Sequence, residues 1–234
     1  DLQSNGTDII RTWDYYLMLR SLMLMDLPAY KTVLINGMVL GEDGRKMSKS
    51  LRNFVTAKDA LSKTGVDSLR YWATKGATGS DLPFSWKEVK HSERFYNKLY
   101  NIMKFIKLNV SKKPLVARPE DLEIADRWIL TKLQGLIKNV TEDMEEFRFN
   151  EAMLRIESFV WHEFADYYIE MVKHRLYNDM NKNAALFALY NCLLNVLRIL
   201  APFAPYTSEE IYQTFFKKFE GGKSIHLEKW PSID

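Results

Sequence analysis

The hydrophobic pattern divides the chain into two parts that meet near residue 87. Before that point, apolar residues follow helical spacing in some stretches and β-rich runs in others. From residue 88 onward they recur every three or four positions through several long stretches, which predicts helices almost throughout. We therefore expect an α/β part over residues 1–87 and an all-α part over residues 88–234, whose helices pack as an antiparallel bundle.

The start of the first part alternates between helix and strand signals. Residues 8–25 have helical spacing, with Thr7 and Asp8 as candidate caps. Two β-rich runs follow, at residues 32–36 and 38–40. A strand next to a capped helix indicates a mixed α/β structure.

Two shorter helices should complete the first part. Thr56 and Asp59 have the spacing of a capping box for one, and Asp67 is a candidate cap for the next. Residues 79–83 contain glycine, serine, aspartate and proline, a composition typical of a loop.

The second part should hold five helices, each with an apolar stripe. A linker at residues 112–119 separates the first two, and Thr207 with Glu210 has the spacing of a capping box for the fifth. The predicted core positions of the first four helices are Phe95, Leu99, Ile102 and Ile106; Ile129, Leu133, Leu136, Val140 and Met144; Met153, Ile156, Val160, Phe164, Tyr167 and Met171; and Leu189, Cys192, Val196 and Leu200.

Composition limits the class of protein without selecting a function. Lys and Arg number 33 against 30 Asp and Glu, a net charge of +3, so a polyanion site would require local clustering. The lone Cys192 excludes an internal disulfide framework and a cysteine-rich zinc site. By the sequence pattern no apolar run approaches the roughly 18 residues of a membrane span, so we expect a cytosolic protein. The chain begins at Asp1 without an initiator Met, which suggests a piece of a longer protein.

The sequence DGRKMSKS, residues 43–50, forms a short basic loop after the second β-rich run. It places Lys46 and Lys49 beside the hydroxyls of Ser48 and Ser50. Two ammonium groups with adjacent hydroxyls suit a phosphate chain, because they neutralise the charge that develops as pyrophosphate leaves. The alternative is a solvated basic turn, the usual role of a charged loop. A Walker A loop is excluded, since its glycine and lysine pattern is absent.

The string at residues 46–50 matches the KMSKS signature of class I aminoacyl-tRNA synthetases, and other segments resemble the same family. Residues 36–45 resemble the adenine-binding strand and turn of its valyl, isoleucyl and leucyl subgroup. Segments that resemble the adenylate-pocket motif, the segment behind the signature loop and the anticodon-binding domain follow in the family's order, at residues 6–13, 66–72, 161–170, 200–205, 208–212 and 225–231. The resemblance covers essentially the whole chain. It implies the C-terminal half of a Rossmann-like nucleotide-binding fold, followed by an anticodon-binding helical bundle.

The resemblance also implies roles for individual residues. Lys46 and Lys49 would be catalytic, by stabilising the phosphates of ATP, and Ile9 with Trp13 would wall the amino-acid pocket. The implied ATP-binding residues hold the ribose, seat adenine or belong to the signature loop: Gly6, Asp8, Gly37, Met38, Val39, Met47, Ser48 and Ser50.

Several of these residues have ordinary structural alternatives. Asp8 could be only a helix cap, Trp13 could belong to the core, and Met47 could simply anchor its loop. His162 has no Cys or His three or four residues later, which favours a structural histidine. Glu163 begins an acidic strip whose expected role is pairing with cations of the bundle.

Ile9 indicates valine as the amino acid. Isoleucine enzymes of the family carry Gln at this place, whereas an apolar residue resembles the valine enzymes. A branched side chain there narrows the cavity, so the extra methylene of isoleucine would clash. The resemblance therefore implies an archaeal-like enzyme that activates valine with ATP and Mg²⁺ and passes it to tRNA(Val). The alternatives are an isoleucyl or leucyl relative, or a non-catalytic tRNA-binding helical fragment.

Asn97, Asn101 and Lys104 are the candidates for tRNA contact. They share one strip of a predicted helix, and in related enzymes an Asn and a basic residue near here meet anticodon bases. A solvated face is the alternative. We expect neither zinc nor another metal site in this segment, no membrane association, and a monomer.

Two departures from the family pattern bear on activity. Arg52 stands where the family usually has a Gly that permits a positive φ. The HIGH signature, the first half of the nucleotide fold and the editing domain are absent from this sequence. The chain alone is therefore not expected to form valyl-adenylate.

Overall fold

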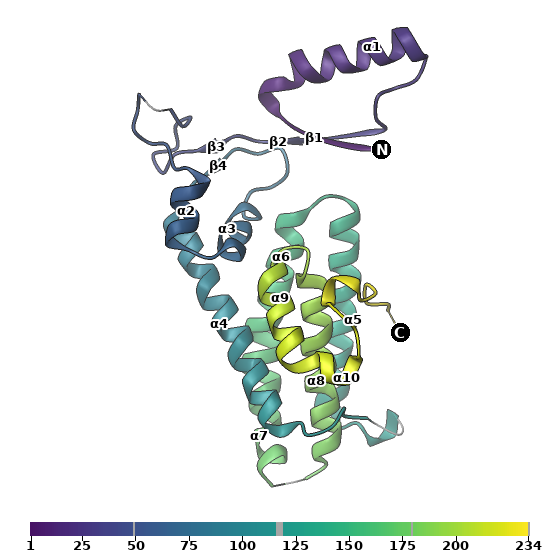
Figure 1. Cartoon of the computed structure of the whole chain (residues 1–234). Coiled ribbons are helices and arrows are strands. Elements are labelled where there is room, and N and C mark those ends of the chain that lie inside the picture. The colour runs from purple at the N-terminus through teal and green to yellow at the C-terminus, as the bar shows by residue number, and fades with distance from the viewer. Residues whose placement is uncertain (49, 116–118, 179, 234) are drawn as a thin grey trace.

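The protein has a small α/β region beside a larger helical region (Figure 1). The computed structural model describes residues 1–48, 50–115, 119–178 and 180–233, so Lys49 lies outside the described residues. A long helix, α4 (Trp86–Asn109), begins next to the α/β region and runs along one side of the helical region. The change from mixed to helical structure thus falls close to residue 87, where the hydrophobic pattern changes.

The α/β region contains two small sheets, each of two parallel strands. They are formed by β1 (Leu2–Gly6) with β2 (Thr32–Asn36), and by β3 (Val39–Leu40) with β4 (Leu82–Pro83). β2 and β3 confirm the strands that were predicted from the two β-rich runs. β1 was not predicted, and β4 lies in a stretch predicted as a loop. Both pair with strands distant in sequence, and strand preference depends on such neighbours more than on local pattern.

A helical segment connects β1 to β2, as the spacing predicted. It begins as a 3₁₀ turn (Thr7–Ile9), widens into a π-turn (Ile10–Asp14) and continues as α1 (Tyr15–Met25). The predicted caps are wrong, because no side chain caps this segment. The chain passes directly from β1 into the first turn with Gly6 at the cap position, so Thr7 and Asp8 are the first and second residues of the helix and lie too late to cap it.

Two short helices follow, as predicted. They are α2 (Ala57–Lys63) and α3 (Val66–Ala73). Thr56 and Asp59 form the predicted capping box, in which the Thr56 hydroxyl accepts a hydrogen bond from the Asp59 N–H at 2.9 Å. The predicted cap of α3 is wrong, since Gly65 occupies the position before it.

Asp67 instead caps a different helix, α9 (Pro205–Ile211). Its buried carboxylate accepts hydrogen bonds from the backbone N–H groups of Tyr206 and Thr207, at 3.4 and 2.6 Å. The predicted Thr207–Glu210 capping box is therefore wrong, because α3 supplies the acceptor that the start of α9 needs. This cap joins the two regions of the protein.

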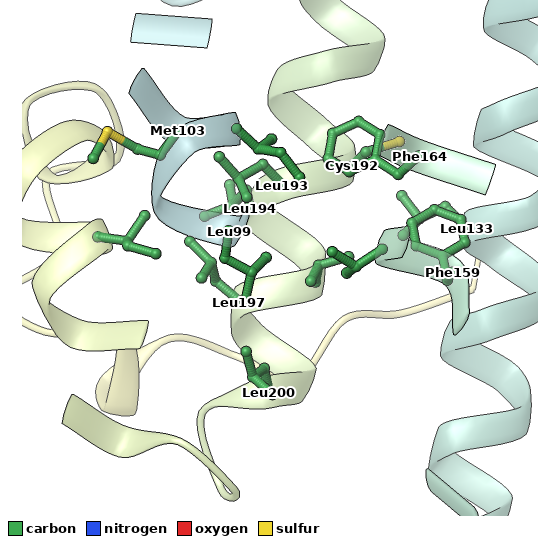
Figure 2. Close-up of a cluster of buried hydrophobic side chains, with 14 of the residues drawn as sticks. Leu99, Met103, Leu133, Phe159, Phe164, Cys192, Leu193, Leu194, Leu197 and Leu200 are labelled. Carbon is green, nitrogen blue, oxygen red and sulfur yellow. The ribbon is translucent and has the colours of Figure 1, made fainter. Parts of the chain in front are cut away.

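The helical region closes around α8. The helices that follow α4 are α5 (Ile124–Glu145), α6 (Phe149–Ser158), α7 (Glu170–Tyr177), α8 (Lys182–Leu200), α9 and α10 (Lys217–Glu220). Figure 2 shows Leu193 and Cys192 of α8 among Leu99 of α4, Leu133 of α5 and Phe164. Every core position predicted for α4, α5 and α8 is buried, except that Met144 is only partly buried.

The helix between α6 and α7 corrects the predicted core of the third helix. Residues Phe159–Ile169 form a π-helix, which has more residues per turn than an α-helix. Tyr167 and Met171, predicted as core, are 55% and 48% exposed, whereas Tyr168 and Val172 are fully buried. The wider turn has moved the inward face by one residue, so a count based on α-helical spacing fails here.

α8 also corrects an expectation from composition. By length and composition it could cross a membrane, contrary to the view that no apolar run approaches that size. However, 72% of its apolar window is buried inside the protein. The helix is apolar all round because other helices surround it.

Candidate active site and RNA-binding face

The parallel pairing of β1 with β2 brings two predicted ATP-binding segments to one edge. Gly6 is opposite Asn36 in the register of the sheet. Both strands end at this edge. Asp8, which follows β1, and residues 37–39, which follow β2, therefore emerge next to each other. The carboxyl ends of parallel strands are where open α/β sheets bind ligands.

The first segment offers a free carboxylate. A side chain on Gly6 would lie 2.8 Å from Asp8 Oδ1, so the glycine gives this carboxylate room. Asp8 is exposed and lies inside a 3₁₀ turn. A carboxylate in this place can accept hydrogen bonds from hydroxyl groups.

The two residues predicted to form the amino-acid pocket lie on the same helical segment. Ile9 is half-buried at the end of the 3₁₀ turn, and Trp13 is 58% exposed in the π-turn. Neither residue lines a cavity of about 490 Å³ or a second of about 340 Å³ in the described part of the chain. Both side chains are therefore at least partly open to solvent.

A buried polar cluster that was not predicted holds this segment against the sheet. Asp14, at the end of the π-turn, accepts hydrogen bonds from the amide of Asn5 in β1 and from Tyr30 Oη, the latter at 3.0 Å. All three side chains are buried. Burial, followed by the hydrogen bond to Asp14, raises the pKa of Tyr30.

The second segment, residues 37–39, makes backbone contacts within the protein. Gly37 is required by close packing, since a Cβ there would lie 2.0 Å from the Ser80 carbonyl oxygen. The Met38 N–H donates to Asp81 at 2.7 Å, and the Met38 carbonyl accepts from the Leu82 N–H at 2.9 Å. The Met38 N–H is therefore engaged within the protein, and its carbonyl already accepts one of the two hydrogen bonds that a carbonyl oxygen can accept.

A cavity of about 490 Å³ lies behind this segment. Gly37, Met38 and Val39 line one side of it, and Phe149 and Phe203 of the helical region line another. The cavity is therefore at the junction of the two regions, and neither Asp8 nor Lys46 borders it.

The signature loop is attached to β3. Lys46 forms an isolated antiparallel bridge with Leu40, and the Gly41 N–H donates to the Arg45 carbonyl at 2.8 Å. The Lys46 side chain is exposed. Met47 packs against a small cluster that includes Trp72 and Phe84, which fits the alternative that it anchors the loop.

Asn53 organises the loop, although the sequence did not single it out. Its side-chain carbonyl accepts from the Ser48 N–H at 2.9 Å, and its amide donates to Asp43 at 3.1 Å. The hydroxyls of Ser48 and Ser50 are 2.9 Å apart. The N–H of Arg45 and the amide of Asn53 hold the pKa of Asp43 below its usual range.

Arg52 adopts the conformation that glycine would take. Its φ is +53°, in the left-handed region that is costly for residues with a Cβ. The turn thus has the positive φ that glycine would permit, although Arg52 occupies the position. The arginine adds backbone strain and an exposed cation beside the loop.

Polar contacts join α3 to the helical region behind the loop. Arg70 donates to the carbonyl oxygens of Phe203 and Pro202, at 3.0 and 2.6 Å. Glu157 of α6 accepts from Tyr71 of α3. These contacts and the Asp67 cap hold α3, the helix behind the signature loop, against the helical region.

Glu157 remains ionised at this junction despite its burial. Burial opposes ionisation, but hydrogen bonds from Tyr71 and His91, together with the charge of Lys75, outweigh it and lower the Glu157 pKa. The His91 Nε2 lies 2.5 Å from the carboxylate, and Lys75 Nζ lies 3.4 Å away. Three elements thus share one buried carboxylate.

The predicted RNA-contact residues lie together on α4. Asn97, Asn101 and Lys104 are all exposed, on the side away from buried Leu99 and Ile106. Lys104 Nζ lies 4.7 Å from the Tyr100 ring centroid. The strip is therefore accessible to a ligand.

The surroundings of His162 and of the acidic strip bear on two further predictions. His162 is exposed, and its Nδ1 lies 3.6 Å from Asp166. Lys98 of α4 also contacts Asp166 at 3.6 Å, and Lys173 contacts Glu170 at 2.5 Å, which supports the pairing role for these two acidic residues. Glu163 does not fit that role, since its Oε2 is buried without a hydrogen-bond partner among the described residues. Within the described ranges, no group of three or more His, Cys, Asp or Glu side chains could hold a metal ion.

Two family models match the chain. Residues 1–85 match the tRNA synthetases class I (I, L, M and V), and residues 126–234 match the anticodon-binding domain of tRNA ligase. The first match contains the sheet edge and the signature loop, and the second contains most of the bundle.

Curated relatives over nearly the whole chain are valine--tRNA ligases of archaea. The chain is 47% identical over 232 residues to that of Thermococcus kodakarensis, 45% over 233 residues to that of Pyrococcus horikoshii, and 43% over 235 residues to that of Methanothermobacter thermautotrophicus. These alignments cover 98–99% of this chain but only 26% of each relative. The chain thus spans about a quarter of the length of these relatives.

Solved structures of class I synthetases share the fold. The ternary LeuRS–tRNA–LeuAMS complex of Agrobacterium radiobacter K84 matches all of this chain and 28% of its own, with a TM-score of 0.77 and 23% identity. Methionyl-tRNA synthetase of Mycobacterium tuberculosis, bound by methionyl-adenylate, matches 90% of this chain and 43% of its own, with a TM-score of 0.75 and 19% identity.

Proposed function

Because the chain belongs to the class I tRNA synthetases, we propose that it is the part of a valine--tRNA ligase that carries the signature loop and the anticodon-binding bundle. The observation that carries this proposal is 43–47% identity to valine--tRNA ligases over nearly the whole chain. The complete protein would activate valine with ATP and transfer it to tRNA(Val). Residues 1–87 would be catalytic, and residues 88–234 would form the antiparallel anticodon-binding bundle.

In this proposal the sheet edge binds the adenylate. Asp8, with the space left by Gly6, accepts hydrogen bonds from the ribose hydroxyls, and residues 37–39 lie beside adenine. Ile9 and Trp13 limit the size of the amino acid. Ser48, whose N–H is bonded to Asn53, and Ser50, whose hydroxyl lies 2.9 Å from that of Ser48, would meet the phosphates.

The cations of the signature loop stabilise the leaving pyrophosphate. The exposed side chain of Lys46 extends from a backbone held by the bridge to Leu40, and Lys49 follows three residues later. Because their role is electrostatic, neither lysine needs to transfer a proton. Mg²⁺ would arrive with the phosphates of ATP, since the described residues contain no cluster of ligands for it.

Amino-acid-dependent ATP–pyrophosphate exchange by the full-length protein tests the proposal. We expect exchange with valine and much weaker exchange with isoleucine or leucine. Preference for isoleucine or leucine would assign the protein to a relative of the same subgroup. Exchange with none of the three, together with retained tRNA binding, would favour the non-catalytic RNA-binding alternative.

A further inference from the structure

The cavity behind residues 37–39 has the size and the lining of a small-molecule site. Its volume of about 490 Å³ lies within the roughly 300–1,000 Å³ of pockets that bind drug-sized ligands. Its exposed wall, residues 77–80, leaves an entrance from solvent. Aromatic and thioether side chains from both regions form much of the remaining wall: Met38, Trp72, Met144, Phe149 and Phe203.

One cation is held at the wall of this cavity. Arg70 is the only charged residue among the described residues that line it. Its Nε and Nη2 donate to the carbonyl oxygens of Phe203 and Pro202, at 3.0 and 2.6 Å, which fixes the guanidinium in place. Its Nη1 has no hydrogen-bond partner in the part of the chain that the structure describes. A guanidinium fixed in this way can donate to an anionic oxygen, and no carboxylate of the wall competes for it.

A strained turn adjoins the same cavity. Phe147 has a φ of +59°, in the left-handed region that bulky side chains rarely adopt. Its carbonyl oxygen accepts a hydrogen bond at 2.6 Å from the hydroxyl of Thr78, which lines the cavity. Its ring packs edge-on against that of Phe149, with 6.1 Å between the centroids. Strain of this kind is concentrated at ligand clamps and switch regions, where the surrounding structure maintains it.

We infer that the cavity binds a small aromatic molecule with one anionic group, such as an aryl carboxylate or sulfonate. The aromatic body contacts Trp72, Phe149 and Phe203, and the anionic group accepts a hydrogen bond from Arg70 Nη1. A cationic ligand would meet the guanidinium without a counter-charge, and a highly polar one would lose its hydrogen bonds to water against apolar walls. The site is separate from the proposed nucleotide site, because it lies behind residues 37–39.

Two matched probes test the inference. Anilinonaphthalenesulfonate has an aromatic body and one sulfonate, and phenylnaphthylamine has the same body without the sulfonate. NMR of methyl-labelled methionine locates each probe on the 234-residue chain, since Met38 and Met144 line the cavity, whereas Met23 and Met25 lie on the exposed apolar surface of α1. We expect saturable shifts of Met38 and Met144 with the sulfonate probe, without matching shifts at Met23 and Met25. The neutral probe should bind about tenfold more weakly, because it makes no charged hydrogen bond.

Three variants separate the effect of charge from that of shape. Arg70→Gln should weaken binding of the sulfonate probe about tenfold and leave the neutral probe unchanged, because it removes the partner of the anion. Ala77→Trp should exclude both probes, since the larger side chain occupies the cavity that Ala77 lines. Arg127→Gln removes an exposed cation of α5 that does not line the cavity, and it is the control. Circular dichroism establishes that each variant is folded, and the comparison of the two probes on the wild type requires no variant.

Several outcomes would overturn the inference. No response of Met38 and Met144 to either probe would exclude the site, and equal affinity for the two probes would exclude the anionic group. Equal loss of both probes in folded Arg70→Gln would exclude pairing with the guanidinium. Binding by the 234-residue chain but not by the full-length protein would mean that the rest of the protein covers the cavity, and the site would be wrong. Amino-acid-dependent exchange plays no part in these measurements, so this inference and the proposed function can fail separately.

Discussion

α1 and α8 are both rich in apolar residues, yet their surroundings are opposite. α8 buries thirteen of its nineteen residues, whereas α1 buries none, and its Met23 and Leu24 are 76% and 82% exposed. The difference extends to their regions. The helical region is closed around its own core, while the α/β region has two two-stranded sheets and presents its proposed chemistry on an open edge. Stability is therefore expected to reside mainly in the helices, and catalytic function in the α/β region.

The largest effect should come from breaking a charge pair inside the helical core. Asp126 is fully buried and accepts from Tyr168 and Arg175, at 2.6 and 2.8 Å. Asp126→Asn would remove the buried counter-charge of Arg175 and leave it only the half-exposed Glu123, at a cost of about 3–5 kcal/mol in the free energy of unfolding. Urea denaturation measures it. The control Lys31→Ala breaks an exposed pair with Asp1 and should cost at most about 1 kcal/mol. Equal losses would refute the contrast between the regions.

Lys46→Ala should affect activity and leave stability nearly unchanged. In the full-length protein we expect adenylate formation to fall about 10²–10³-fold, the range for loss of one preorganised electrostatic group, and valine affinity to persist. Pre-steady-state exchange kinetics separate the two quantities. Lys58→Ala, which removes an exposed cation from α2, is the control. A loss confined to valine affinity would contradict the assigned role.

Glu157→Gln tests how firmly the two regions are joined. Loss of the ionised acceptor for Tyr71 and His91 should cost about 1–3 kcal/mol. The Glu157 pKa is lowered in the folded state, so its contribution is complete above the unfolded pKa and is lost as pH falls through the folded value. Urea unfolding of the wild type should therefore lose more stability from about pH 6 to 3 than unfolding of the variant does. Glu170→Gln, in an exposed pair, is the control, and identical pH profiles for wild type and Glu157→Gln would count against the junction.

Ile9→Ala should change which amino acid the open edge accepts. Removal of methyl-sized groups enlarges the site by an amount worth roughly 1–3 kcal/mol, so exchange with isoleucine should rise tenfold or more relative to valine. Ile10→Ala, its exposed neighbour, is the control for general damage. An unchanged ratio in the Ile9 variant would place that side chain away from the substrate.

The smallest effect concerns the strained turn of the signature loop. Arg52→Gly removes a left-handed conformation that costs roughly 1–2 kcal/mol, partly offset by the greater freedom of glycine when unfolded. We expect the Ser48 amide, which is bonded to Asn53, to exchange with solvent roughly fivefold more slowly. Arg52→Ala keeps the strain and should not slow exchange. Slower exchange in both variants would implicate the arginine side chain instead.

Regular local periodicity made most of the helical region predictable. The stripes of α4 and α5 were readable because each helix keeps one apolar face along its length, and the core positions of α8 were readable because that helix is apolar on almost every side. The Thr56–Asp59 cap was equally local, since both partners lie within one turn. The core prediction for the third helix failed at Phe159–Ile169, because the wider turn there changed the helical period that the prediction assumed.

Only some residues of the candidate site could be predicted from the sequence. Motif strings marked Lys46 and Asp8, because the family resemblance is carried by consecutive residues. The buried cluster around Asp14 and the support from Asn53 were missed, because each depends on side chains brought together by folding.

The sequence by itself determined the helices, the basic loop and the family, because each is encoded in neighbouring residues. Only the tertiary structure decided that β1 and β2 share one edge, that Asp67 caps α9 rather than its own helix, and that α8 is enclosed while α1 is exposed. These outcomes depend on burial and hydrogen bonding between segments up to 140 residues apart, as for Asp67 and Thr207, and no local pattern contains that information.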